Sequence, residues 1–152
     1  MCLSWGRLME LFFTNKPGGN SRPFILDLQM FWIPEVNHFL QSVSEENGKT
    51  ASPHTSRAYG YHLVDWLSYA EEVGLDWKLA SHRQLAMYRN ALARDNSILT
   101  KRPLKRETVN LRLGMICTFY KFMVAISTSP SCRLNSRTFE WDIRATRTKW
   151  PI

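Results

Sequence analysis

The sequence has few cysteines and no long apolar run, and the lack of these features excludes several classes of protein. Its three cysteines, Cys2, Cys117 and Cys132, are widely spaced and odd in number. They form neither a disulfide framework nor a CxxC metal site, and this usage fits a reducing cytoplasm. No uninterrupted apolar run approaches the about 20 residues that span a bilayer, so we expect no membrane partner. Arg7 and Glu10 interrupt the apolar start of the chain, which argues against a signal peptide.

The sequence also lacks the patterns that hold common cofactors. Gly18-Gly19 has no following lysine motif and no preceding strand, so it is not a phosphate-binding loop. His38, His62 and His82 show no clustering with cysteines or carboxylates at the spacing of metal ligands. We therefore expect no cofactor, no metal and no small-molecule substrate.

Positive charge is concentrated in the last third of the chain. Residues 1–100 contain 9 Lys/Arg and 10 Asp/Glu, whereas residues 101–152 contain 11 Lys/Arg and 3 Asp/Glu. The net charge of the whole chain is +7. Such a distribution favours a polyanionic partner. The alternative at this point is a basic face that is simply solvated.

Hydrophobic periodicity predicts four amphipathic helices. They are expected from Pro34 to about residue 45, over about 54–73, from after Ser81 to about Ala93, and over about 105–126. Gly74 fits the left-handed position after a helix end. Residues 24–32 are a candidate short strand, but no convincing set of strands exists. The pattern predicts a compact all-α domain over residues 34–130, with an irregular N-terminal arm (1–33) and a basic C-terminal tail or linker (131–152).

Three short motifs occur in a characteristic order along this domain. Thr55-x-x-x-Tyr59 leads to Leu63-x-x-Trp66-Leu67, then comes Gly74-Leu75-Asp76-Trp77, and Thr108-Val109-Asn110-x-Arg112-Leu113 leads to Phe119-Tyr120. Together they resemble the N-terminal, SAM-like core-binding domain of tyrosine recombinases of the phage-integrase type, over roughly residues 34–130. No single motif is diagnostic, because each spacing is common on helices.

The resemblance implies a fold and a role. The family domain is a four-helix, SAM-like orthogonal bundle that forms one half of a C-shaped clamp around duplex DNA. It implies double-stranded DNA as the partner, with other recombinase protomers possible on the same DNA. The chain stops where the family's catalytic domain is expected to begin, so we expect a non-catalytic module of a site-specific recombinase rather than an enzyme.

Two helix starts carry the side chains expected to contact DNA. A helix N-terminus offers unpaired N–H groups and partial positive charge, which suit phosphate, and Asn can read a base edge. The candidates are hydroxyl, amide and basic residues in or near the first turns of the second and fourth helices: Thr55, Ser56, Arg57, Lys101, Arg102, Lys105, Arg106, Thr108, Asn110 and Arg112. Helix capping by Thr55 and Ser56, and solvated charge at Lys105 and Arg106, are the alternatives.

A catalytic interpretation is rejected. His54-Thr55-Ser56-Arg57 matches the HxxR spacing of the recombinase active site, and Tyr88 lies at a plausible separation for a nucleophile. The other groups of that active site are missing, and Tyr88 shares a helix face with Leu85 and Leu92, as a buried core tyrosine does.

Two further functions stay open. A helix-turn-helix transcription regulator would dock one recognition helix as a dimer, but no short two-helix unit with a tight glycine turn is present. A helical protein-interaction module would use the basic third of the chain to bind an acidic protein.

Overall fold

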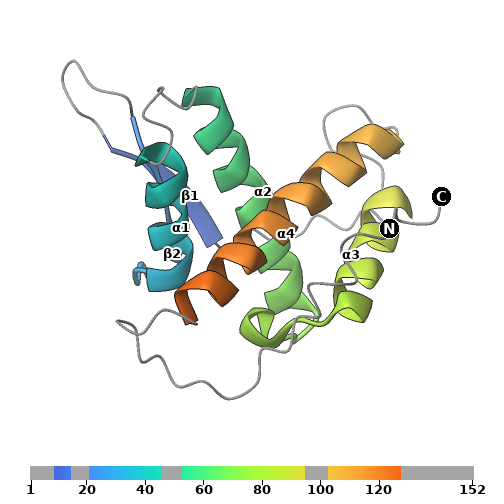
Figure 1. The fold of residues 1–152 in the computed structure, drawn as a ribbon. Coiled ribbons are helices and arrows are strands. Elements are labelled where there is room, and N and C mark those ends of the chain that lie inside the picture. The colour runs from blue at the N-terminus through green and yellow to red at the C-terminus, as the bar shows by residue number, and fades with distance from the viewer. Residues whose placement is uncertain (1–8, 15–20, 46–52, 95–102, 128–152) are drawn as a thin grey trace.

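The computed structural model describes residues 9–14, 21–45, 53–94 and 103–127, which form four helices and one two-stranded sheet (Figure 1). The all-α prediction is therefore confirmed in broad terms. The described elements, in chain order, are β1 (Met9–Phe13), β2 (Pro23–Asp27), α1 (Pro34–Glu45), α2 (Pro53–Glu72), the short 3-10 helix η1 (Trp77–Leu79), α3 (His82–Arg94) and α4 (Arg106–Ser127).

The helix boundaries follow the local signals in the sequence. Proline is the first residue of both α1 and α2, where its missing N–H costs nothing. Ser81 caps α3 by a reciprocal pair: its Oγ accepts from the N–H of Gln84 at 3.4 Å, and its own N–H donates to Oε1 of Gln84 at 2.7 Å. At the end of α2, Gly74 has φ of +67°, and the N–H of Leu75 donates to the carbonyl of Ala70 at 2.7 Å.

The core forms where α2 and α4 cross. Trp66 on α2 and Tyr120 on α4 are 0% and 1% exposed, and the indole N–H of Trp66 donates to the Tyr120 hydroxyl at 2.9 Å. That hydroxyl donates to the backbone carbonyl of Trp77 at 2.6 Å, so one buried chain of hydrogen bonds joins three elements. Phe39 of α1 packs against Phe119 with ring centroids 5.3 Å apart. Aromatic contacts therefore pack α4 against both α1 and α2.

The N-terminal arm is not irregular throughout, and this part of the sequence prediction was wrong. β1 and β2 pair antiparallel, from Met9 opposite Asp27 to Phe13 opposite Pro23, and form a hairpin within residues 1–33. Residues 24–27 fall inside the segment that was predicted as a possible strand. The predicted tail, residues 131–152, lies outside the described residues.

The hairpin is anchored to the helices by a buried amide. Asn37 of α1 is 3% exposed; its Oδ1 accepts from the N–H of Ile25 at 2.7 Å, and its Nδ2 donates to the carbonyl of Ile25 at 2.8 Å. The amide thus pairs with the outer edge of β2 as a neighbouring strand would. On α2, Gly60 allows close approach, because a Cβ there would meet the Leu11 side chain at 2.8 Å.

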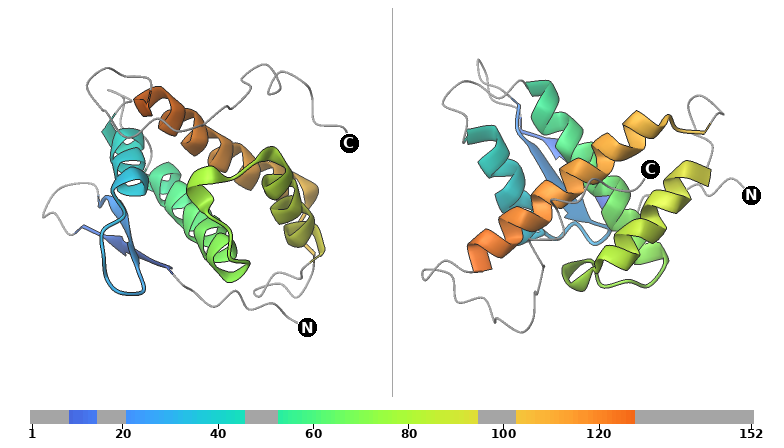
Figure 2. Two further views of the ribbon diagram at one scale, coloured as in Figure 1. Left: turned by 90° about the horizontal axis from the view of Figure 1, so that it is seen from below. Right: turned by 45° about the vertical axis from the view of Figure 1, so that its right-hand side comes forward.

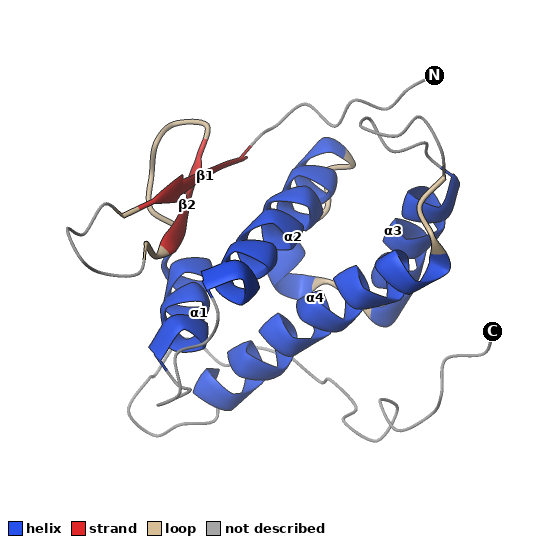
Figure 3. Cartoon of the chain, turned by 90° about the horizontal axis from the view of Figure 1, so that it is seen from above, coloured by secondary structure: helices blue, strands red, loops and turns tan. Residues whose placement is uncertain are grey.

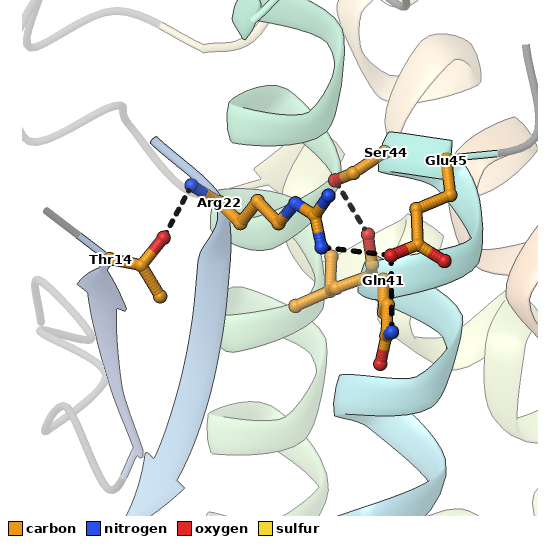
Figure 4. Close-up of polar contacts among 6 residues, drawn as sticks. Thr14, Arg22, Gln41, Ser44 and Glu45 are labelled. Atoms are coloured by element: carbon orange, nitrogen blue, oxygen red, sulfur yellow. Dashed lines mark hydrogen bonds and ion pairs between the residues drawn. The ribbon is translucent and has the colours of Figure 1, made fainter. Parts of the chain in front are cut away.

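A polar contact fixes the other end of the hairpin to the last turn of α1 (Figure 4). Arg22 donates from Nη1 to Oε1 of Glu45 at 2.8 Å, and Gln41 donates to the same oxygen at 3.2 Å. The N–H of Arg22 also donates to the Thr14 hydroxyl at 3.0 Å. Both ion-pair side chains are about half exposed, so this contact orients the hairpin more than it stabilises the fold.

The elements form successive layers around α2. The hairpin packs on α1 and α2, and α4 packs against α1, α2 and α3 from the other side, as Figure 3 shows. By length and composition alone α4 is apolar enough to cross a membrane, a test that core helices of soluble proteins also pass. Here one face of α4 is built into the core through buried residues that include Val109, Leu113 and Ile116.

Candidate nucleic-acid interface

The first turns of α2 present polar and basic side chains, but one predicted contact residue faces inward. Thr55 and Arg57 are exposed, whereas Ser56 is only 4% exposed. Ser56 lies seven residues before Leu63, two helical turns away on the same buried face. Its hydroxyl is therefore not presented to a ligand in this structure, and of the three residues predicted at the start of α2, Thr55 and Arg57 are the ones that solvent reaches.

Arg57 is held by an aromatic ring of the hairpin. Its guanidinium lies over the ring of Phe13 at 5.0 Å from the centroid, and Phe13 in turn contacts Tyr61 of α2 with centroids 6.5 Å apart. A cation over an aromatic face gains on the order of 0.5–1 kcal/mol at an exposed site. The contact restricts the Arg57 side chain at the start of α2 while leaving its charge in solvent. No local pattern predicts this pairing, because Phe13 precedes Arg57 by 44 residues.

The start of α4 presents a second basic surface. Lys105, Arg106 and Asn110 are exposed, and Thr108 is partly buried. The carbonyl of Lys105 accepts the first helical hydrogen bond, from the N–H of Val109 at 3.1 Å, so the two cations flank the positive end of the helix. The predicted residues Lys101 and Arg102 lie outside the described residues.

Arg112 has a different role from the cations that precede it. Its Nη1 donates to Oδ2 of Asp65 on α2 at 3.0 Å, and its side chain is 22% exposed. The buried Nε atom of Arg112 has no hydrogen-bond partner among the described residues. Arg112 therefore ties α4 to α2 at their crossing, and its charge is already compensated by a carboxylate.

Burial and the Arg112 charge change the titration of the neighbouring side chains. Burial, with a further contribution from Arg112, lowers the pKa of His62 from 6.5 to about 4. His62 is accordingly neutral near pH 7. Burial raises the pKa of Tyr88 well above its ordinary value. Tyr88 is 1% exposed and packs on Trp66, so its assignment as a core tyrosine is confirmed and it is not positioned as an exposed nucleophile.

The two helix starts occupy separate arms of the fold. Figure 2 (right) shows α2 and α4 crossing as an X, with the first turns of each helix at the end of a different arm. The ties at the crossing are the Trp66–Tyr120 hydrogen bond and the Arg112–Asp65 ion pair. The exposed groups of α2 and α4 are thereby held apart at a spacing that the core fixes. Such an arrangement can contact two separated stretches of a phosphate backbone.

The described part of the chain offers no alternative metal chemistry. Within residues 9–14, 21–45, 53–94 and 103–127 no group of three or more His, Cys, Asp or Glu side chains could hold a metal ion. Cys117 is a free thiol that is partly buried, and burial raises its pKa. A neutral thiol of this kind is a poor nucleophile and a poor metal ligand.

Residues 36–126, which run from the first turn of α1 almost to the end of α4, match the phage integrase, N-terminal SAM-like domain family. The match covers more than half of the chain, and the chain belongs to this family, which gives it a recombinase-related role. The match extends over the SAM-like domain alone, and no catalytic-domain family is found. No curated protein and no solved structure matches the chain.

Proposed function

We propose that this chain is the DNA-binding module of a tyrosine-type site-specific recombinase, and that it grips duplex DNA with the first turns of α2 and α4. Six exposed or partly exposed groups on these turns would make the contacts. Thr55, Arg57, Lys105, Arg106 and Thr108 would bind phosphates, and Asn110 would read a base edge. The observation that supports this most is the exposure of both basic helix starts at the ends of two crossed helices, within a domain of the integrase family. A DNA partner also favours an intracellular location.

Arg112 and Ser56 are left out of the proposed contact set. Arg112 is paired with Asp65, and using it for phosphate would break the ion pair that joins α4 to α2. Ser56 is buried on the core face of α2. Their roles in this proposal are to hold the two helix starts in place.

The module is proposed to have no catalytic activity by itself. Tyr88, the tyrosine whose separation from His54–Arg57 suggested a nucleophile, is enclosed by aromatic rings. A nicked suicide duplex that traps covalent intermediates should yield no protein–DNA adduct with this chain. An adduct that disappears in Tyr88→Phe would contradict this part of the proposal.

Salt dependence of binding tests the proposal as a whole. A module that makes a handful of phosphate contacts should bind duplex DNA with a Kd of about 10⁻⁴–10⁻⁶ M at physiological salt and with little sequence preference. Fluorescence anisotropy across a salt series should give a linear fall of log K with log salt concentration. No binding even at low salt, or binding that salt does not weaken, would favour a protein-interaction module instead.

The helix-turn-helix alternative is weakened by the connections between helices. α2 and α3 are separated by residues 73–81, which include η1, and this is longer than the three- or four-residue turn of that motif. α2 and α3 are therefore not joined by the short turn that such a unit requires.

A further inference from the structure

The hairpin and the turn that follows it expose an apolar surface outside the family domain. We define the hairpin patch as Phe12, Phe24, Leu28, Met30, Phe31 and Trp32. Four of these side chains lie in the turn between β2 and α1 and are largely exposed: Leu28 60%, Met30 59%, Phe31 64% and Trp32 57%. They precede residue 36, where the family match begins. Adjoining exposed side chains of this size are unusual on a monomer and mark interaction surfaces.

The turn is rigid. Oδ1 of Asp27 accepts from the N–H groups of Gln29 at 2.9 Å and Phe31 at 2.8 Å, and the N–H of Asp27 donates to the carbonyl of Phe31 at 3.1 Å. A partner that docks here would meet a preformed surface, so little conformational entropy is lost on binding.

Met30 occupies an unfavourable backbone conformation at the tip of this turn. Its φ of 63° lies in the left-handed region, where glycine or asparagine is the usual residue. A large apolar side chain therefore stands where glycine would close the turn with less strain. The strain places an apolar group in solvent, which is explained if another surface covers it.

Stacked rings connect the turn to the outer face of the hairpin. Trp32 stacks on Phe24 with centroids 5.8 Å apart, and Phe24 stacks on Phe12 at 5.5 Å. Phe12 and Phe24 are opposite each other in the pairing of β1 with β2, while alternate residues such as Leu11 and Ile25 face the helices. The patch is thus continuous from the turn across the hairpin and has no cation, and the exposed carboxylate of Glu10, two residues before Phe12 on the same face of β1, borders it.

The charge and the area of the hairpin patch indicate what kind of partner can bind there. Without a cation it does not suit a polyanion, and the hairpin lies on the side of α2 opposite α4 (Figure 3). Apolar side chains of about 200 Å² each, exposed by around 60%, give roughly 500 Å² of turn surface, or about 1,000 Å² across two identical patches. That total suits a weak, reversible protein interface.

We infer that the hairpin patch joins two copies of this chain face to face about a twofold axis. An apolar aromatic surface with its only neighbouring charge, Glu10, at the border is complementary to itself, and two sheets can pack with their side chains interdigitating. Edge-to-edge growth is blocked at β2, because the Asn37 amide occupies that edge. The inference does not depend on DNA binding, and α4 of each copy remains uncovered for its own ligand.

Sedimentation velocity of the full chain over about 1–200 µM, without DNA, tests the inference. The parent should shift from monomer to dimer across this range, as expected for an interface of this size. Phe31→Asp should weaken association about tenfold or more, because a charge would be buried at the centre of the interface. Leu79→Asp is the matched control: Leu79 is 59% exposed but lies in η1, and this variant should dimerise like the parent.

Met30→Gly separates association from folding. It should weaken the dimer through loss of an apolar side chain, while its thermal midpoint stays at or above that of the parent because the turn is relieved of strain. A parent that stays monomeric at 200 µM overturns the inference. So does a dimer that Phe31→Asp leaves intact, or a series of higher oligomers in place of a single dimer.

Discussion

Basic side chains occur both where α2 and α4 cross and at the starts of these two helices, but their surroundings differ. At the crossing, Arg112 is paired with Asp65, and Tyr120 is hydrogen-bonded on both sides. On the arms, Lys105 and Arg106 stand in solvent. Basic residues six and seven positions apart therefore differ in their surroundings, and in our proposal one holds the fold while the other two contact a ligand. The difference shows that charge alone does not distinguish a cation that is paired within the fold from one that solvent reaches, whereas burial and partners do.

Tyr120→Ala should give the largest effect, because it removes a core aromatic from the crossing. We expect a loss of about 3–5 kcal/mol in the free energy of unfolding, enough to unfold a marginal domain. Tyr120→Phe is the matched control. It keeps the ring but leaves the Trp66 indole and the Trp77 carbonyl without their partner, at a cost of about 1–3 kcal/mol. Urea unfolding measures both. A Tyr120→Ala protein as stable as the parent would contradict the described core.

Asp65→Asn should come next, because it removes the carboxylate that compensates Arg112. A loss of about 1–2 kcal/mol in the free energy of unfolding is expected, reduced by the partial exposure of Asp65. Thermal unfolding at low and high salt provides the check, since the difference between variant and parent should shrink as salt screens the pair. An equal difference at both salt concentrations would mean that the ion pair is not the cause.

The pH dependence of stability should report His62. Its pKa is about 4 in the folded protein and near 6.5 when unfolded, so the unfolded state binds more protons between these values. The His62 contribution to the free energy of unfolding is therefore fully present above pH 6.5 and is lost as the pH falls towards 4. The full shift corresponds to ~3 kcal/mol, and the partial exposure of the ring reduces the expected loss to about 1–2 kcal/mol. His62→Gln should flatten this part of the profile in urea titrations at each pH, and an unchanged slope would exclude His62 as its source.

The helices were predictable because their signals are local. Periodicity, Pro34, Ser81 and Gly74 each act within a few residues, and the structure uses all of them. The hairpin was missed, although two short apolar runs on either side of a stretch with glycine and proline are themselves a hairpin signal.

Which of the candidate site residues are buried or paired was harder to predict from the sequence. Ser56 is two turns from Leu63, so its burial could have been inferred from helix geometry. The Arg112–Asp65 pair joins residues 47 positions apart, and the Arg57–Phe13 contact joins the hairpin to α2. Contacts of this kind depend on tertiary packing, which no local pattern contains.

The central claim is that the exposed cations at the start of α4 bind DNA phosphates. The most direct measurement is the slope of log K against log salt for duplex DNA, by fluorescence anisotropy, in the double variant Lys105→Ala/Arg106→Ala. The matched control, Arg83→Ala/Lys121→Ala, removes two exposed cations elsewhere on the protein. The account predicts that the first variant melts within about 0.5 kcal/mol of the parent and loses roughly 2 from the magnitude of its salt slope, while the control keeps the parental slope. A parental slope in the first variant, or an equal loss in both, would show that the start of α4 is only a solvated basic turn.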